Sequence, residues 1–138
     1  MIILDTNVLS ELMRPLPNVD VLAWMAAQPR PSLFTTTLTE AELRLGIELV
    51  SEGARRARLA VAVEGVFHED LAGAVLPFDR AAARSYALIV AARRRSGRPI
   101  SPIDAQVAAI AVSRGAAVAT RNVVDFTGCG CEVINPWG

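Results

Sequence analysis

The chain has 138 residues with a formal net charge of +0, and 52% of its residues are hydrophobic while only 5% are aromatic. This length is close to the commonest size of a domain, so we expect a single domain over residues 1–138 with an aliphatic core. The net charge of zero excludes a uniformly basic surface that binds nucleic acid along its whole extent. All 14 basic residues are arginine, and the absence of lysine excludes sites that need a P-loop lysine or a Schiff-base lysine.

Short apolar runs alternate with longer segments of helical period along the chain. We expect strands at residues 2–4, 33–36, 75–77, 117–119 and 133–134. We expect helices at residues 7–13, 19–28, 38–50, 54–66, 81–95 and 103–113. Strands that alternate with helices favour a parallel sheet covered on both faces. The predicted fold class is therefore α/β, a three-layer α/β/α sandwich around a central parallel sheet of four to five short strands.

Four carboxylates stand where predicted strands end or within the helices that follow. Asp5 ends the first strand, Glu42 and Asp104 lie in helices, and Asp125 follows the strand at residues 117–119. The carboxyl ends of parallel strands and the adjoining helix starts meet at one edge of a sheet, so we expect these acids to converge. Converging carboxylates repel one another unless a cation binds, and oxygen ligands suit Mg²⁺ or Mn²⁺. The sequence therefore predicts a divalent-metal site for hydrolysis at phosphorus.

Glu42 has a competing structural interpretation. It completes a capping box with Thr39, in which a glutamate needs no metal. The same box is available from Thr37 to Glu40, so Glu42 is not required for it. Helical spacing instead places Glu42 on one stripe with three leucines, Leu38, Leu45 and Leu49. This stripe predicts an acid on a buried face.

The other three acids also have structural alternatives. Asp5 could cap the first helix, and Asp125 could be an ordinary loop residue. Asp104 could be a first-turn acid of a helix capped by Ser101, with Pro102 at the first helical position. The rest of that helix is apolar nearly all round, however, and a charge on such a helix needs a partner.

Two arginines near the acids are candidates for contacting phosphate. Arg98 precedes Asp104 in sequence, and Arg121 follows the strand at residues 117–119. Guanidinium groups match phosphate oxygens well. The alternative for residues 93–98 is a solvated helix end, where cations stabilise the negative C-terminus of the helix.

The cysteines and the apolar segments indicate a compartment. Cys129 and Cys131 are separated by one residue, which is poor geometry for a disulfide. The N-terminal residues lack a basic region followed by a long apolar run, and no stretch reaches the roughly 20 apolar residues that span a membrane. We therefore expect a cytoplasmic protein without membrane association.

Five segments, in order and across nearly the whole chain, resemble the PIN domain and more narrowly the VapC-type ribonuclease toxins of prokaryotic toxin–antitoxin pairs. They are residues 3–7 with 10–11, the helix around Glu42 with Leu45 and Gly46, residues 102–106 with 108–111, residues 119–122 running to 125–126, and the closing residues 133–137. The resemblance implies a PIN-like fold.

The resemblance also implies roles for individual residues. Asp5, Glu42 and Asp104 match the core acids of the family, with Asp5 and Asp104 as direct metal ligands. Family members carry the fourth acid at one of two positions, which here hold Asn122 and Asp125, so Asp125 is expected to act directly or through water. Thr6, Thr120 and Asn122 are expected to orient ligands or water.

The implied activity is that of a metal-dependent endoribonuclease, which hydrolyses RNA phosphodiester bonds with a carboxylate-held Mg²⁺ that Mn²⁺ can replace. The implied substrate is structured RNA such as tRNA or ribosomal RNA. A cognate antitoxin would fill the groove and block the acids, and the aliphatic helices would supply a homodimer surface.

Two alternatives remain at this point. A catalytically weak PIN-like binding module is favoured by the amide at Asn122. A phosphoryl-accepting Asp5 is disfavoured, because no second acid lies two residues on and no lysine is present.

Overall fold

The computed structural model describes all residues from 1 to 138. The strands are β1 (Ile2–Leu4), β2 (Leu33–Thr36), β3 (Val75–Leu76), β4 (Ala117–Ala119) and β5 (Val133–Ile134). The helices are α1 (Thr6–Leu12), α2 (Val19–Ala27), α3 (Thr37–Leu49), α4 (Ala54–Gly65), α5 (Arg80–Arg95), α6 (Pro102–Arg114) and α7 (Val123–Phe126), with short helical turns at Arg30–Ser32 and Val66–Asp70. None of the helices combines the length and the apolar character needed to cross a membrane.

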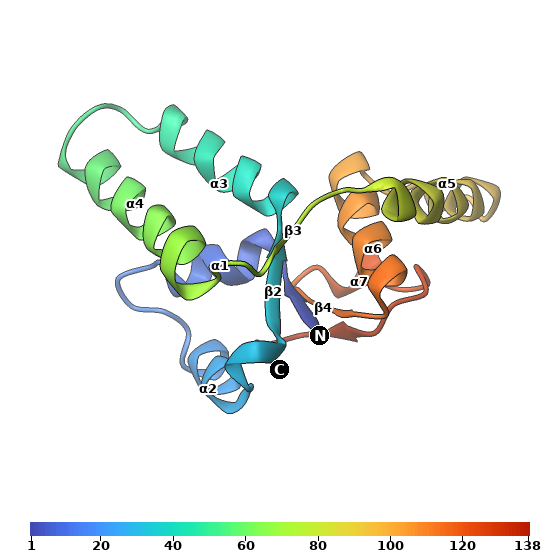
Figure 1. Ribbon diagram of the computed structural model, residues 1–138, viewed down its shortest axis with the longest axis horizontal. Helices are drawn as coiled ribbons and strands as arrows, with labels where there is room; N and C mark the ends of the chain where they lie inside the picture. Colours follow the sequence, from blue (N-terminus) through green and yellow to red (C-terminus); the bar gives the residue numbers. More distant parts are fainter.

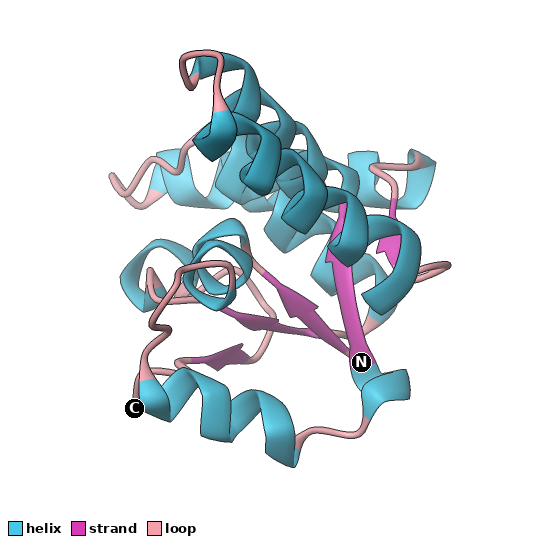
Figure 2. Ribbon diagram, turned by 90° about the vertical axis from the view of Figure 1, so that its left-hand side faces the viewer, coloured by secondary structure: helices cyan, strands magenta, loops and turns pink.

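The five strands form one parallel sheet in the order β3-β2-β1-β4-β5. Helices α1 to α4 lie on one side of the central strands and α5 to α7 on the other (Figure 1), and the edge-on view shows strands between helices (Figure 2). The predicted α/β class and parallel sheet are confirmed. So are the predicted strands, except that the one at 75–77 stops before Pro77.

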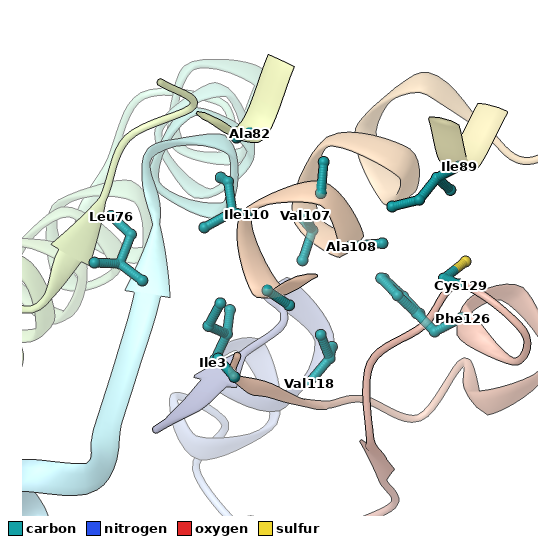
Figure 3. Packing of buried hydrophobic residues seen from close by; sticks show 13 residues of the cluster. Ile3, Leu76, Ala82, Ile89, Val107, Ala108, Ile110, Val118, Phe126 and Cys129 are labelled. Carbon is teal, nitrogen blue, oxygen red and sulfur yellow. The ribbon is translucent and has the colours of Figure 1, made fainter. Parts of the chain in front are cut away.

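Each central strand is buried on both faces. Ile3 of β1 and Val118 of β4 belong to one core cluster with α5, α6 and α7, and Figure 3 shows these side chains beside Val107 of α6. Leu4, the next residue of β1, belongs to the second cluster with α1 to α4. Because successive strand residues point to opposite faces, an uninterrupted apolar run fits a strand covered on both sides.

Helix α6 is the most deeply buried helix, with six buried residues from Ala105 to Ala111. The Ser101 hydroxyl accepts the Asp104 N–H at 3.3 Å, and Pro102 occupies the first turn. The predicted start of this helix is therefore confirmed. It ends at Arg114, and the next residue, Gly115, caps it with a φ of 64°, the left-handed conformation that favours glycine.

The prediction for the exposed and buried faces of α3 is wrong. Its buried residues are Thr39, Leu43 and Ile47, whereas Leu45 is 58% exposed and Leu49 77% exposed. Glu42 is exposed as well. Helices α3 and α4 form an arm that extends from the sheet (Figure 1), and along this arm α3 buries Leu43 and Ile47 in the core cluster that it shares with α1 and α4.

Neither predicted capping box forms at the start of α3. The cap is Thr36, whose hydroxyl accepts the N–H of Thr39 at 3.2 Å. Glu40 instead pairs with Arg44 at 2.7 Å on the helix surface. Glu42 is therefore free of a capping role.

Candidate functional site

Asp5 lies at the carboxyl end of β1 and is only 5% exposed. Its Oδ1 accepts the backbone N–H of Thr6 at 2.9 Å, so it caps α1 as its structural interpretation predicted. Its Oδ2 accepts the hydroxyl of Thr120 at 2.9 Å and the amide Nδ2 of Asn7 at 3.4 Å. Three donors therefore fix both carboxylate oxygens.

Thr120 connects the ends of β1 and β4. Besides donating to Asp5, its fully buried hydroxyl accepts the Asn7 Nδ2 at 3.2 Å and the Asn122 N–H at 3.0 Å. The Arg121 N–H donates to Asn7 Oδ1 at 3.1 Å. The two strand ends thus share one hydrogen-bonded network around Asp5.

Glu42 approaches this network from α3. Its Oε1 accepts the Thr6 hydroxyl at 2.6 Å. The hydroxyl oxygens of Thr6 and Thr39 lie 3.1 Å apart. Thr6 therefore links Asp5 to Glu42, with its backbone N–H on one acid and its hydroxyl on the other.

Like charges and burial act on the acids together. Burial raises the pKa of Asp5; the hydrogen bonds from Thr6 and Thr120 lower it, and the charges of Asp104 and Glu42 raise it further. Burial likewise raises the pKa of Asp104, which a hydrogen bond with Ser101 lowers and the charges of Asp125 and Glu42 raise. Asp5, Glu42 and Asp104 therefore lie close enough for their charges to interact, and Asp125 lies close enough to act on Asp104.

Asp5, Glu42 and Asp104 line a single pocket with a volume of about 490 Å³. Its other lining residues are Thr6, Asn7, Ser10, Glu11, Arg14, Arg121, Asn122 and Trp137. Trp137 is the one hydrophobic residue among them. Asp125 is exposed beside the pocket and does not line it. The structure thus brings three of the predicted acids together in what we name the acidic pocket.

The donor atoms of the acidic pocket suit a hard divalent cation, because they are carboxylate, hydroxyl and amide oxygens. No three acidic, histidine or cysteine side chains are close enough together to hold one ion as they stand. The chemistry of the pocket fits such an ion, and Asp5, Asp104 and Glu42 are the side chains that would hold it.

Arg93 has a structural role that the sequence did not reveal. It is buried, and its Nη1 donates to the carbonyl oxygens of Asp125 at 3.0 Å and Thr127 at 3.4 Å. Its Nε donates to the carbonyl of Arg98 at 2.6 Å. The expected solvated helix end is therefore wrong for Arg93, which holds the loop of α7, while Arg98 is exposed and does not line the acidic pocket.

Trp137 and Glu11 line the acidic pocket and were not predicted as site residues, whereas Arg121 was predicted to contact phosphate. The Arg121 guanidinium lies 5.2 Å from the centre of the Trp137 ring, which forms one wall with it. Glu11 is buried, and its carboxylate is 3.3 Å from Arg14 Nη1 and from the N–H of Asn18. The signal available in the sequence was the Ser10-Glu11 pair, which belongs to the first of the segments that resemble the PIN domain.

Comparison with known proteins identifies the family. The PIN domain family model matches residues 2–124. VapC ribonuclease Y4jK of Sinorhizobium fredii is 45% identical over 99% of this chain and 98% of its own length. Toxin FitB of Neisseria gonorrhoeae is 38% identical over 99% of both chains.

Solved structures agree with this result. A chain of the FitAB complex bound to the IR36 DNA fragment has a TM-score of 0.94 and 37% identity, covering 100% of this chain and 96% of that one. A chain of the DNA-bound VapBC complex of Salmonella typhimurium has a TM-score of 0.83 and 27% identity, covering 98% and 97%. The chain therefore belongs to the PIN domain family and, within it, to the VapC-type proteins.

Proposed function

We propose that this protein is a metal-dependent endoribonuclease that acts as the toxin of a toxin–antitoxin pair. The observation that carries the proposal is the single pocket in which Asp5, Glu42 and Asp104 meet from β1, α3 and α6. The names of the relatives, a VapC ribonuclease and a toxin, support it. The substrate we propose is structured RNA such as tRNA or ribosomal RNA.

The proposed ion is Mg²⁺, with Mn²⁺ able to replace it, held by Asp5 and Asp104 together with Glu42 and through water by Asp125. When bound, such an ion activates water and stabilises negative charge on the phosphate oxygens. Without it, a cluster of carboxylates would repel a phosphodiester rather than bind it.

The surrounding residues prepare the acids for this role. The Thr120 hydroxyl and the Thr6 N–H keep Asp5 in one orientation. The Thr6 hydroxyl orients Glu42 toward the same pocket. Preorganised oxygen atoms reduce the rearrangement needed when an ion and substrate bind.

The proposed partner is a cognate antitoxin that covers the acidic pocket and keeps the enzyme inactive. The FitAB and VapBC complexes among the structural neighbours support a partner of this class. We also propose that the protein forms a homodimer, for which exposed aliphatic residues such as Leu49 and Leu88 offer surface.

Cleavage of RNA by the purified protein tests the proposed activity. We expect cleavage in Mg²⁺ or Mn²⁺, none in EDTA, and none by Asp104→Asn. Asp20→Asn is the matched control, because Asp20 is an exposed acid on α2 outside the acidic pocket. Cleavage that persists in EDTA, or in the Asp104 variant, would contradict the proposal.

A second candidate is a PIN-like module that binds RNA without cleaving it. The absence of three acids already close enough to hold an ion favours it. RNA binding without cleavage in either metal would support this candidate. Crystals soaked in Mn²⁺ that show density between Asp5 and Asp104 would count against it.

A further inference from the structure

A second groove opens from the acidic pocket between α1, α3 and α4. Its volume is about 710 Å³, and it shares Thr6, Ser10, Arg14 and Glu42 with the acidic pocket, so the two are continuous. Its other lining residues are Met13, Pro15, Leu43, Gly46, Arg55, Arg58, Leu59 and Ala62. We name it the arginine groove.

The arginine groove carries positive charge. Arg14, Arg55 and Arg58 line it, against the single acid Glu42. Arg55 and Arg58 are exposed and form neither an ion pair nor a hydrogen bond, whereas their neighbour Arg56 pairs with Glu48 at 2.7 Å. Two guanidinium groups are therefore available to an external anion.

The spacing of these two groups suits a repeating anion. Arg55 and Arg58 are three residues apart on α4, so they lie one turn apart with about 5–6 Å between their Cβ atoms. Successive phosphates along a nucleic-acid strand are separated by a similar distance. Guanidinium groups also match phosphate oxygens in geometry.

The groove has open space where a strand would pass. Gly46 of α3 lines it, and a Cβ atom added at Gly46 would meet no atom within 4 Å. Only four of its twelve lining residues are hydrophobic. A separate groove near α2 is lined mainly by hydrophobic residues such as Leu12, Met25 and Leu71. The arginine groove therefore suits a polyanion better than the apolar face of a protein helix.

We propose that the arginine groove binds the backbone of the RNA strand next to the cleaved phosphate, with Arg55 and Arg58 contacting phosphates. This inference rests on the proposed ribonuclease activity. The chain has no net charge, and the acidic pocket itself repels a polyanion, so attraction must come from cations beside it. Because the arginine groove is continuous with the acidic pocket, Arg55 and Arg58 lie on the path of an RNA strand that enters the pocket.

The electrostatic test uses the double variant Arg55→Ala/Arg58→Ala, with Arg84→Ala on α5 as the control. Both are placed in Asp104→Asn protein, so that a fluorescein-labelled single-stranded oligoribonucleotide stays intact during anisotropy titrations. We expect the double variant to bind at least tenfold more weakly. The slope of log affinity against log salt should fall in magnitude by about 1.4, since two phosphate contacts are lost. Arg84→Ala should match its parent.

Cleavage kinetics separate a role in binding from a role in chemistry. With Asp104 intact, the double variant should raise KM while kcat stays unchanged, because the lost contacts act equally on bound substrate and transition state. Thermal unfolding that matches the parent will show that both variants are folded. If the double variant does not fold, Arg58→Gln alone should show a slope reduced by about 0.7.

A steric test needs no change of charge. The glutamine side chain of Gly46→Gln should extend into the groove and weaken RNA binding severalfold while the salt slope stays unchanged, and Gly46→Ala should bind RNA as the parent does.

Unchanged RNA affinity and salt slope in the double variant, with wild-type cleavage intact, would overturn the groove assignment and leave the ribonuclease proposal standing. If the double variant binds RNA as the parent does but binds the cognate antitoxin more weakly, the groove is a protein-binding site and the RNA assignment is overturned as well. A wild-type protein that neither binds nor cleaves RNA would end both proposals.

Discussion

Replacing Asp104 with asparagine should stabilise the metal-free protein while it abolishes RNA cleavage. A carboxylate in the first turn of α6 gains about 0.3–1 kcal/mol from the helix dipole. Burial and the charges of Asp125 and Glu42 oppose this gain, and because they raise the pKa of Asp104 despite the hydrogen bond with Ser101, the cost exceeds the gain. Because Asp104 is only half-buried, solvent screening weakens these effects, and we expect asparagine to raise the free energy of unfolding at pH 7 by less than about 1 kcal/mol, or less than about 3 °C in melting temperature.

Urea unfolding followed by circular dichroism in EDTA measures this difference. The folded-state pKa of Asp104 lies above its ordinary value of 3.8, so the folded protein takes up the proton more readily than the unfolded chain. The wild type therefore loses stability as pH rises from about 4 through the raised pKa, and its difference from the variant should vanish below that range. Added Mg²⁺ should stabilise the wild type alone. If the asparagine variant is instead less stable than the wild type by about 1 kcal/mol in free energy of unfolding at pH 7, the Asp104 carboxylate stabilises the start of α6, and the reasoning is refuted.

Two further substitutions test the network that supports the acids. Thr120→Val should lower the free energy of unfolding by about 1–3 kcal/mol and slow cleavage, because Asp5 loses a hydrogen-bond donor. The control is Thr35→Val, which removes a buried hydroxyl that donates to the backbone carbonyl of Leu4. It should lower the free energy of unfolding by a similar amount in urea and leave cleavage intact. Arg93→Met should cost about 2–3 kcal/mol, because the carbonyl of Asp125 and its neighbours lose a charged donor; an unchanged melting temperature would show that water replaces the guanidinium.

The strands were predictable because both faces of the sheet are covered. Ile3 and Leu4 belong to opposite core clusters, so the strand appears in sequence as an unbroken apolar run. The helix start at Ser101 was equally clear, since its hydroxyl accepts a backbone N–H three residues on. The four-residue helix α7 escaped prediction, because one turn is too short to show a period.

The convergence of the acids was predictable, but their surroundings were not. Asp5 and Thr120 follow neighbouring parallel strands, so topology alone brings them together. The buried face of α3 was misassigned, because Leu45 and Leu49 suggest a core stripe although the arm leaves them exposed. Trp137 reaches the acidic pocket from the far end of the chain, and only the fold reveals that contact.

The structural and functional interpretations of Asp5 turn out to be compatible, because one carboxylate both caps α1 and lines the acidic pocket. Asp5 caps α1 and accepts three hydrogen bonds, so its position is independent of any ligand. Exposed Glu42 accepts one, from the hydroxyl of Thr6, and can exchange that bond for another partner at little cost. A cation held by the acidic pocket would therefore use Asp5 as a fixed ligand, while Glu42 could exchange its bond with Thr6 for a bond to the cation. In such a pocket, hydrogen bonds fix the position of Asp5 in advance, and Glu42 can adapt its position to the group that binds.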